Sequence, residues 1–207
     1  LDSGELGAIW RFNSAFDLDE PGSLEAGPHG GLLRDLGSHL VDQALWLFGP
    51  VERVSSRLEW IELPAGRTDS GFALRLDHAN GVASFLAASK LNRVVRRVVE
   101  LYGEGGAYLA TGSDVQTGAI KAGLRPKDDP SGWGYEPEAH WGRLLTAAGE
   151  RVVPSARGNH ADYYTAFAKA VAEGTEVPVP VADAVAVLAV LDAARVSALE
   201  HRTVALA

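Results

Sequence analysis

The first third of the chain carries apolar residues at the spacing of one helical face. The residues of this stripe are Leu33, Leu36, Leu40, Ala44 and Leu47. Spacings of three and four predict an amphipathic helix over residues 32–48. Gly49 and Pro50 follow directly. They end the helix because glycine favours the terminating conformation and proline cannot continue the hydrogen-bond ladder.

Apolar positions outside this helix recur mostly at every second residue. Strands are predicted over residues 6–16, 51–61, 71–78, 82–88 and 94–102. Asn80 and Gly81 form a two-residue hairpin signal, and Gly103-Glu104-Gly105-Gly106 closes the last of these strands before Tyr108 and Leu109 start another. Neighbouring strands with short turns favour an antiparallel or mixed sheet over repeated βαβ units.

The rest of the chain predicts two helices and one region without a clear pattern. Residues 112–158 are broken up by Gly, Pro and acidic residues and give no assignment. Residues 159–173 predict a helix with apolar residues four apart, and residues 181–200 predict another that is rich in Ala and Val on most sides. We expect the second helix to be well buried. An extended Pro-rich link at 177–180 joins them, and one α+β domain over 1–207 is the economical interpretation.

Composition and charge narrow the class of protein. The chain has 207 residues, of which 46% are hydrophobic and 22% charged, which is typical of a globular protein. Its formal net charge of −8 and lack of a basic stripe argue against nucleic-acid binding. The one basic cluster, Arg93, Arg96 and Arg97, lies on a predicted strand, where we expect a solvated sheet edge.

Missing residue types give further expectations. The chain has no Cys, which excludes disulfides and thiolate metal sites within it and fits a cytoplasmic location. No apolar run reaches the roughly 18 residues of a membrane span, and we expect no membrane partner. The chain also has no Met, so we expect it to be part of a longer protein.

A second stripe on the first helix carries the candidate chemistry. Asp35, His39, Asp42 and Trp46 recur at helical spacing beside the apolar stripe. Histidine exchanges a proton near neutral pH, and a carboxylate one turn away can orient it or accept a hydrogen bond from a substrate hydroxyl. Oxidation of an alcohol also requires a hydride acceptor, which no side chain supplies.

The same pair has other interpretations. An Asp and a His one turn apart are commonly a solvated or structural pair. They could also be two metal ligands, but the remaining histidines show no metal spacing, and we predict no metal site. Those histidines are His29, His78, His140, His160 and His201.

The whole stretch around this pair resembles a known family. Gly30-Gly31, then Asp35-Leu36-Gly37-Ser38-His39, then an apolar helix with Trp46 and a closing Gly49 resemble the C-terminal domain of the glucose-fructose oxidoreductase / inositol dehydrogenase (Gfo/Idh/MocA) family. Residues 101–107 resemble that family's strand–glycine turn–strand. Residues 159–206 resemble its closing helix pair.

The resemblance implies a fold and a function. The fold is an open, mainly antiparallel mixed sheet with helices packed on one face, and the other face makes a homo-oligomer. His39 transfers the proton and Asp35 binds or polarises a hydroxyl of a sugar, polyol or cyclitol. The family's nicotinamide cofactor, NAD or NADP, is bound by an N-terminal Rossmann domain that also supplies a lysine from a Glu-Lys-Pro motif. This chain contains neither that motif nor a Gly-x-Gly-x-x-Gly loop, so we expect no cofactor-binding residue in it and no turnover by it alone.

Further substrate-binding candidates are weaker. Arg11 and Asn13 alternate to one face of the first strand, His140 lies beside Trp141 in the unassigned region, and His160 begins a helix. Two other functions stay open: a non-catalytic sugar-binding or scaffold module on the same fold, and a metal-dependent hydrolase or lyase that uses Asp35 and His39.

Overall fold

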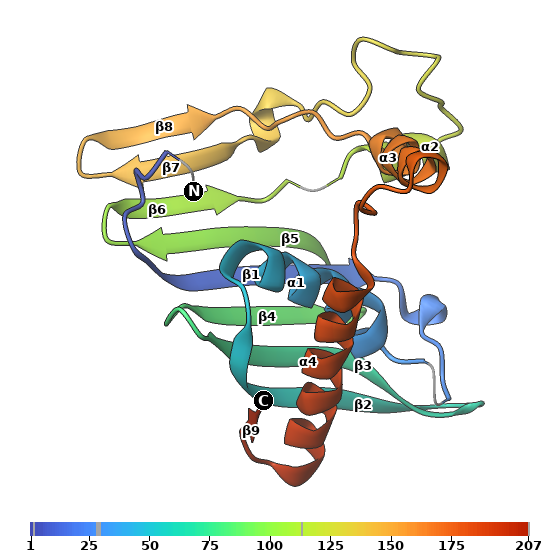
Figure 1. Cartoon of the computed structure of the whole chain (residues 1–207). Coiled ribbons are helices and arrows are strands. Elements are labelled where there is room, and N and C mark those ends of the chain that lie inside the picture. The colour runs from blue at the N-terminus through green and yellow to red at the C-terminus, as the bar shows by residue number, and fades with distance from the viewer. Residues whose placement is uncertain (2, 28–29, 113, 207) are drawn as a thin grey trace.

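The computed structural model describes residues 1, 3–27, 30–112 and 114–206. Within them, nine strands form one sheet, with helices on one of its faces (Figure 1). The strands are β1 (Ile9–Asp19), β2 (Val51–Leu63), β3 (Gly66–His78), β4 (Ala83–Ser89), β5 (Leu91–Gly103), β6 (Gly106–Ala110), β7 (Gly142–Thr146), β8 (Gly149–Val153) and β9 (Val204–Ala205). The longer helices are α1 (Leu32–Phe48), α2 (Gln116–Lys121), α3 (His160–Glu173) and α4 (Val181–Glu200). Two short 3₁₀ turns cover Pro21–Ser23 and Glu138–His140.

The sheet is mixed, as the sequence predicts. Its strand order is β8-β7-β6-β5-β1-β4-β3-β2-β9. Only the β1–β4 pair is parallel among the described strands, because α1 carries the chain back before the β2-β3-β4 meander begins. The α+β class and the open sheet are therefore confirmed.

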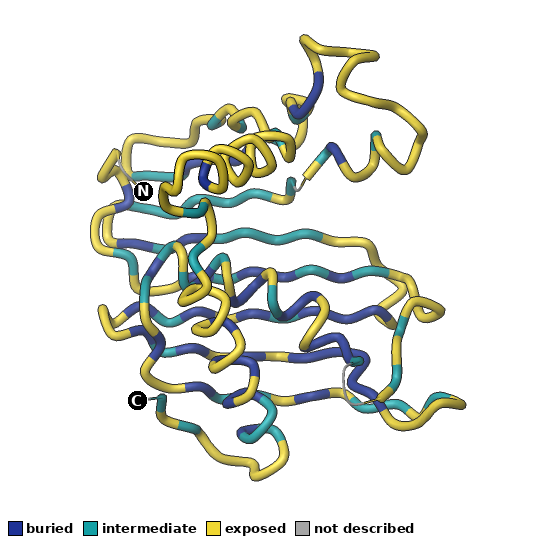
Figure 2. Tube along the Cα trace, turned by 45° about the vertical axis from the view of Figure 1, so that its right-hand side comes forward, coloured by how far each residue is buried: buried dark blue, intermediate teal, exposed yellow. Residues whose placement is uncertain are grey.

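The core lies between the sheet and two helices, α1 and α4 (Figure 2). The predicted apolar stripe of α1 faces the sheet: Leu33 and Leu40 are fully buried, and Phe48 packs on Phe12 of β1 with ring centroids 5.4 Å apart. Each such side chain contributes about 1.5–3 kcal/mol on burial. The helix bounds match the predicted ones, since Gly49 ends α1 with φ 75°.

The unassigned region adds a hairpin to one edge of the sheet. Strands β7 and β8 pair with each other, and β7 extends the sheet beyond β6. Each has five residues, and β8 is mostly exposed. Strands of five residues leave too little alternation for a sequence pattern to detect.

One expectation about burial is wrong, and a second holds only in part. The first half of α4 is exposed, with Val181 at 77% and Val185 at 57%, because only its second half lies over α1 and β2. The basic cluster is not uniformly solvated either. The first half of β5 is an exposed edge that pairs with β1 alone, but Arg97 is half-buried and stacks over Phe16 at 4.7 Å. Burial lowers the pKa of the Arg97 guanidinium.

Helix α3 carries an apolar stripe that the other described residues leave about half exposed or more. Tyr163, Phe167 and Val171 are 47%, 45% and 69% exposed, whereas Ala170 is buried. Among the helices of the described residues, none is long and apolar enough to span a membrane.

Candidate functional site

The second stripe of α1 faces outward along its whole length. Asp35, His39, Asp42 and Trp46 are all exposed, and Trp46 reaches 83%. They lie on the side of α1 opposite the core because the apolar stripe occupies the side that packs on the sheet. The prediction that these four residues share one face of the helix is confirmed. Their chemical roles stay predictions.

The start of α1 is capped from a distant strand. Gly31 at the N-cap has φ 100° and no side chain, and the buried carboxylate of Asp69 on β3 accepts the Leu33 N–H at 2.6 Å. A Cβ on Gly31 would collide with that carboxylate, and one on Gly30 would collide with the Glu25 carbonyl oxygen. Glycine at both positions therefore lets the Asp69 carboxylate and the Glu25 carbonyl oxygen lie close to the backbone.

A polar cavity of about 310 Å³ opens beside this helix start. It is lined by Ser23, Leu24, Glu25, Gly30, Gly31, Leu32, Arg34, Asp35 and Lys90. The Asp35 side chain is 51% exposed, so its carboxylate is available to a ligand in the cavity. Two carboxylates and two cations among these residues give the cavity a balanced charge.

Lys90 is the residue that sequence reasoning missed. It lies between β4 and β5, its side chain is only 6% exposed, and its Nζ donates to Asp35 Oδ2 at 2.8 Å. Fifty-five positions separate the two residues, so no spacing pattern connects them. The available signal was a lysine two residues after the predicted strand 82–88, where it can be buried with the strand end.

His39 lies one turn further along α1 and does not line this cavity. Its side chain is exposed, and the described residues give its ring no hydrogen-bond or ion-pair partner. Both ring nitrogens are therefore open to a molecule that approaches the outer face of α1. Asp35 and His39 are brought to the same face, which is the minimum that proton transfer from a bound hydroxyl requires.

Arg11 and Asn13 lie on the opposite face of the sheet. Their neighbours Phe12 and Ser14 point toward α1, where Ser14 Oγ donates to Gln43 Oε1 at 3.1 Å. Alternation therefore turns Arg11 and Asn13 away from Asp35. Asn13 donates to Glu100 at 2.8 Å, and Arg11 stacks over Tyr102 at 4.1 Å. The structure does not bring these two residues to the α1 site.

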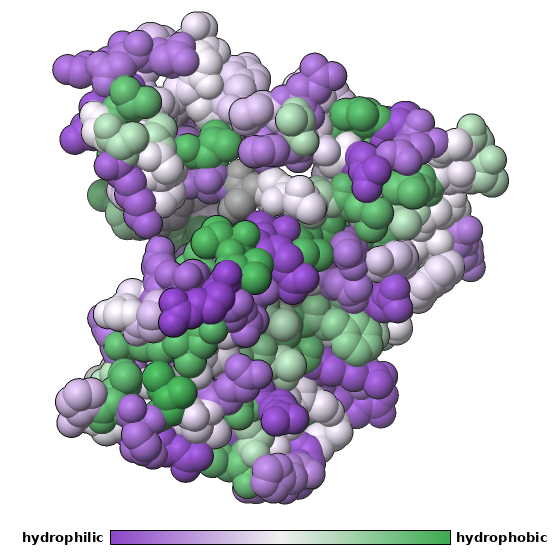
Figure 3. Space-filling view, turned by 180° about the vertical axis from the view of Figure 1, so that it is seen from behind, coloured by the Kyte–Doolittle hydropathy of each residue, from purple (hydrophilic) through white to green (hydrophobic). Residues whose placement is uncertain are grey.

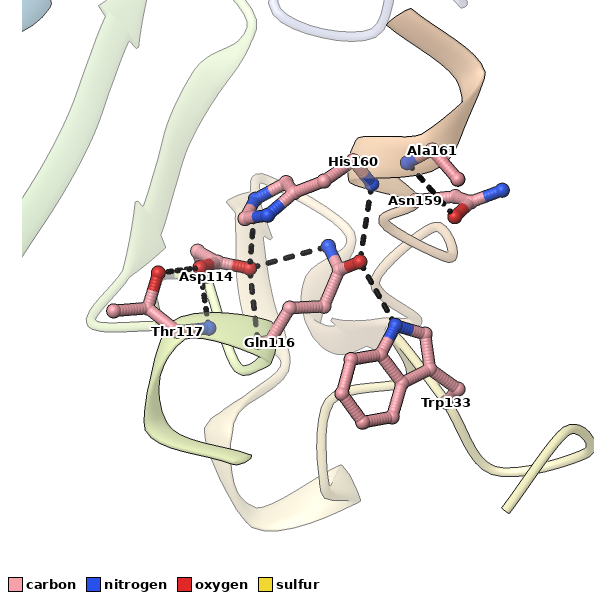
Figure 4. Close-up of polar contacts among 7 residues, drawn as sticks. All are labelled: Asp114, Gln116, Thr117, Trp133, Asn159, His160 and Ala161. Atoms are coloured by element: carbon pink, nitrogen blue, oxygen red, sulfur yellow. Dashed lines mark hydrogen bonds and ion pairs between the residues drawn. The ribbon is translucent and has the colours of Figure 1, made fainter. Parts of the chain in front are cut away.

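His140 and His160 lie apart from the cavity as well. His140 is exposed in the short Glu138–His140 turn. His160 begins α3 in a separate polar cluster with Asp114, at 3.4 Å between His160 Nε2 and Asp114 Oδ1 (Figure 4). Neither histidine lines the cavity beside Asp35.

The polar cluster is centred on Gln116, which is 3% exposed. Its Oε1 accepts from Trp133 Nε1 at 3.1 Å and from the backbone N–H of His160 at 3.0 Å (Figure 4). Burial raises the pKa of Asp114, but hydrogen bonds from Thr117 and Gln116 together with the His160 charge outweigh it, so the net pKa lies below its ordinary value. The ionised carboxylate thus holds this junction together, which favours a structural role for His160.

A second, larger cavity of about 710 Å³ adjoins the outward stripe. Asp42 and Trp46 of α1 line one side, and Pro178, Val179 and Asp183 before and within α4 line the other. Its lining is more apolar than that of the first cavity. Among the described residues, no three His, Asp or Glu side chains gather closely enough to hold a metal ion.

Comparisons with known proteins give consistent matches. The family model described as the GFO/IDH/MocA C-terminal domain matches residues 1–109. The chain is 31% identical over 180 residues to scyllo-inositol 2-dehydrogenase (NADP(+)) IolW of Bacillus subtilis (strain 168), covering 85% of this chain and 49% of that protein. It is 31% identical over 220 residues to the uncharacterized oxidoreductase YdgJ of Escherichia coli (strain K12), covering 100% of this chain and 61% of that protein.

The solved structures agree with the sequence matches. The putative oxidoreductase yvaA from Bacillus subtilis superposes with a TM-score of 0.85 at 27% identity, covering 100% of this chain and 60% of that one. The chain thus spans 49% to 61% of the length of these three proteins.

Proposed function

The chain belongs to the Gfo/Idh/MocA oxidoreductase family through its C-terminal domain, and from that premise we propose that it is the substrate-side part of an NAD(P)-dependent oxidoreductase. The reaction oxidises a hydroxyl group of a sugar, polyol or cyclitol, or reduces the corresponding ketone. The observation that carries the proposal is the outward face of α1, where Asp35 borders a polar cavity and His39 is accessible one turn away.

Each of the two side chains has one task. Asp35 accepts a hydrogen bond from a substrate hydroxyl, which orients the carbinol carbon. His39 takes the hydroxyl proton as the C–H bond breaks, and returns it in the reverse direction. The bound nicotinamide supplies the acceptor for the hydride. The hydroxyl proton goes to His39, and the carbinol hydrogen would leave with both electrons of the C–H bond as the hydride, so the oxidation balances.

Another domain binds the nucleotide in this proposal. In the described part of the chain, Gly103–Gly106 joins the antiparallel strands β5 and β6, and a Cβ on Gly106 would collide with the Leu145 carbonyl oxygen. This turn opens no helix, so it offers no site for a pyrophosphate. Such a domain can pack on exposed apolar residues of this chain, which lie on α3, at the start of α4 and at Trp46. The chain alone is therefore expected to be inactive.

The lining of the cavity supports an uncharged, polyhydroxylated substrate. Glu25 and Asp35 can accept hydrogen bonds from hydroxyls, and Lys90 and Arg34 balance their charge. A relative of this chain is named for its action on scyllo-inositol. Cyclitols and related polyols are thus the first compounds to assay.

The experiment uses the protein that contains this chain together with its nucleotide-binding domain. Reduction of NAD⁺ and NADP⁺ is followed with a panel of sugars, polyols and cyclitols. We expect His39→Asn to lower kcat by about 10²–10⁴-fold, the usual contribution of a general base. His201→Asn is the matched control, because His201 is exposed beyond α4 in a left-handed conformation that asparagine tolerates.

Three outcomes would contradict the proposal. Unchanged turnover in His39→Asn would remove the proton-transfer role. Absence of turnover in the wild-type protein, combined with measurable polyol binding, would favour the sugar-binding or scaffold module instead. Stoichiometric zinc or manganese bound through Asp35 and His39 would favour the hydrolase or lyase.

The second proposal concerns assembly. No helix of the described chain covers the rear face of the sheet, on which hydrophobic side chains lie among charged ones (Figure 3). Val98, Ala15, Ala87 and Ala73 lie opposite one another across β5, β1, β4 and β3. No side chain of this row is larger than valine, which leaves room for another surface to approach closely, and we propose that a second copy of the protein packs on it.

A further inference from the structure

Lys90 lies behind Asp35 at the polar cavity, and we propose that it is the positioning residue of the site. Its buried ammonium group holds the Asp35 carboxylate toward the cavity, in the orientation that receives the substrate hydroxyl. The inference rests on the proposed function and deepens it. Lys90 acts through Asp35, which makes it a positioning residue and not a catalytic one.

The backbone of Lys90 is held from both sides. Its N–H donates to the Ser70 carbonyl at 3.2 Å, and its carbonyl accepts from the Glu20 N–H at 3.2 Å. The residue therefore bridges β3 and the end of β1 while it joins β4 to β5. Its side chain is 6% exposed. Packing therefore restricts the conformation of the side chain, in addition to the hydrogen bonds that hold its backbone.

The charge of Lys90 requires Asp35. Burial of an ammonium group is costly unless a counter-charge and hydrogen bonds replace water. Within the described residues, Asp35 is the partner recorded for Nζ, with 2.8 Å between Nζ and Oδ2. The cavity that both residues line gives the other N–H groups of the ammonium access to water or ligand.

Asp35 gains its orientation from this contact. A carboxylate that is 51% exposed on a helix surface would otherwise sample several rotamers, and a ligand would have to select one of them. The Lys90 contact occupies Oδ2 and leaves Oδ1 without a recorded partner in the described residues. Oδ1 is thus the atom that accepts the substrate hydroxyl.

A purely structural pair is the competing explanation. In that case the ion pair only fastens α1 to the β4–β5 junction, and its loss lowers stability without a specific effect on the substrate. The two explanations differ in how the effects of substitutions combine. If Lys90 acts through Asp35, its removal matters only while the carboxylate is present.

The kinetic test is a double-mutant cycle in the protein that contains this chain and its nucleotide-binding domain. The variants are Lys90→Met, Asp35→Asn and their combination, assayed with the best polyol. We expect Lys90→Met to lower kcat/KM by about 10- to 100-fold, chiefly through KM, because a charge-assisted contact to the substrate loses its geometry. The double variant should be no worse than Asp35→Asn alone, and Lys90→Arg should recover part of the loss.

A control separates stability from positioning. Arg143→Met breaks the ion pair between Arg143 and Glu150, 2.9 Å apart on the β7–β8 hairpin at the far edge of the sheet. It should leave kcat and KM unchanged. The inference would be overturned if the losses of kcat/KM in Lys90→Met and Asp35→Asn multiplied in the double variant. A Lys90→Met protein that is folded and fully active would overturn it as well.

A second measurement does not depend on turnover. Crystal structures of wild-type and Lys90→Met protein give the position of the Asp35 carboxylate directly. We expect the carboxylate to leave its wild-type rotamer once the ammonium group is gone. An unmoved Asp35 would overturn the positioning role whether or not the wild-type protein oxidises a polyol. Absence of turnover with a displaced Asp35 would instead count against the proposed function alone.

Discussion

Asp69 is a single buried residue on which the geometry of the site depends. It caps α1 from β3, 36 positions from the N–H it accepts, and it approaches Arg195 of α4 at 3.7 Å. A carboxylate at a helix N-terminus also interacts favourably with the partial positive charge there. The position of Asp35, one turn into the helix, thus depends on a residue of another element.

Substitution of Asp69 should therefore loosen the start of α1. We expect Asp69→Ala to lower the free energy of unfolding by about 2–3 kcal/mol, since it removes both a helix cap and a charge-assisted hydrogen bond. Asp69→Asn keeps an acceptor oxygen and should lose about half as much. Urea denaturation measures both values. An asparagine variant as unstable as the alanine variant would show that capping is not the reason.

His78 gives the fold a dependence on pH. Its ring is buried, with Nδ1 2.9 Å from the Gly49 carbonyl and Nε2 2.8 Å from Ser84 Oγ. Burial lowers its pKa from 6.5, and the weaker effects of the Gly49 hydrogen bond and of Asp77 oppose this. The neutral ring therefore donates through Nδ1 and accepts through Nε2.

Stability should decline as His78 is forced to take a proton. The unfolded chain binds that proton below pH 6.5, whereas the folded chain binds it only at lower pH. The free energy of unfolding should thus be steady above this pH and fall below it, by at most about 1.4 kcal/mol per pH unit. Denaturation at a series of pH values tests this, and His78→Gln should flatten the decline relative to the wild type.

Whether a residue of the site could be predicted depends on how far it lies in the sequence from the residues it contacts. Asp35 and His39 could be predicted because one helix turn separates them and a repeating pattern defines the helix. Lys90 and Asp69 could not be predicted, because their contacts with α1 arise only when β3 and the β4–β5 junction fold against it. Arg11 and Asn13 were predicted to share a face, but the pattern does not say on which side of the sheet α1 packs.

At the scale of elements, α3 is held at its start and uncovered along its length. Its apolar stripe stays largely exposed among the described residues, whereas its first turn is tied to α2 and to Trp133 through Gln116. A helix anchored at one end by polar contacts opens locally more easily than one packed in a core. The side chain of Gln116 therefore controls the local stability of α3.

Removal of that side chain should release α3 without unfolding the sheet. Gln116→Leu keeps a similar volume but leaves the Trp133 indole N–H and the His160 N–H without their acceptor. We expect hydrogen exchange in α2 and α3 to accelerate by about 10- to 100-fold, in line with a local loss of about 1–3 kcal/mol. Peptides from α1 are the internal reference, and equal acceleration there would mean global destabilisation instead.

Elements differ in how well the sequence predicts them. The bounds of α1 and α4 match because glycine, proline and a left-handed residue mark their ends locally. The β7–β8 hairpin was missed because its strands gain their partners from β6 rather than from their own pattern. The exposure of the first half of α4 was missed because an apolar pattern predicts burial without identifying the partner.

At the scale of the whole molecule, the two faces differ in what covers them. The front face buries its apolar residues under α1 and α4 (Figure 1). The polar cavity opens at the start of α1, and Asp42 and Trp46 of the outward stripe line the larger cavity. Over the rear face, the described part of the chain places no helix. A nucleotide-binding domain on the front and a second copy on the rear could therefore bind at the same time.

The rear face provides a test of assembly that leaves the front face intact. Ala87 lies in β4, between Ala15 and Ala73 of the neighbouring strands, so a long charged side chain there would stand between two packed sheets. We expect Ala87→Arg to shift the protein from an oligomer to a monomer in light scattering, with its polyol oxidation kinetics retained at the α1 site. Ala148→Arg in the exposed β7–β8 turn adds the same charge away from the row of small residues and should leave the mass unchanged. A wild-type protein that is already monomeric, or an Ala87→Arg protein with the wild-type mass, would mean that a second copy does not use this face.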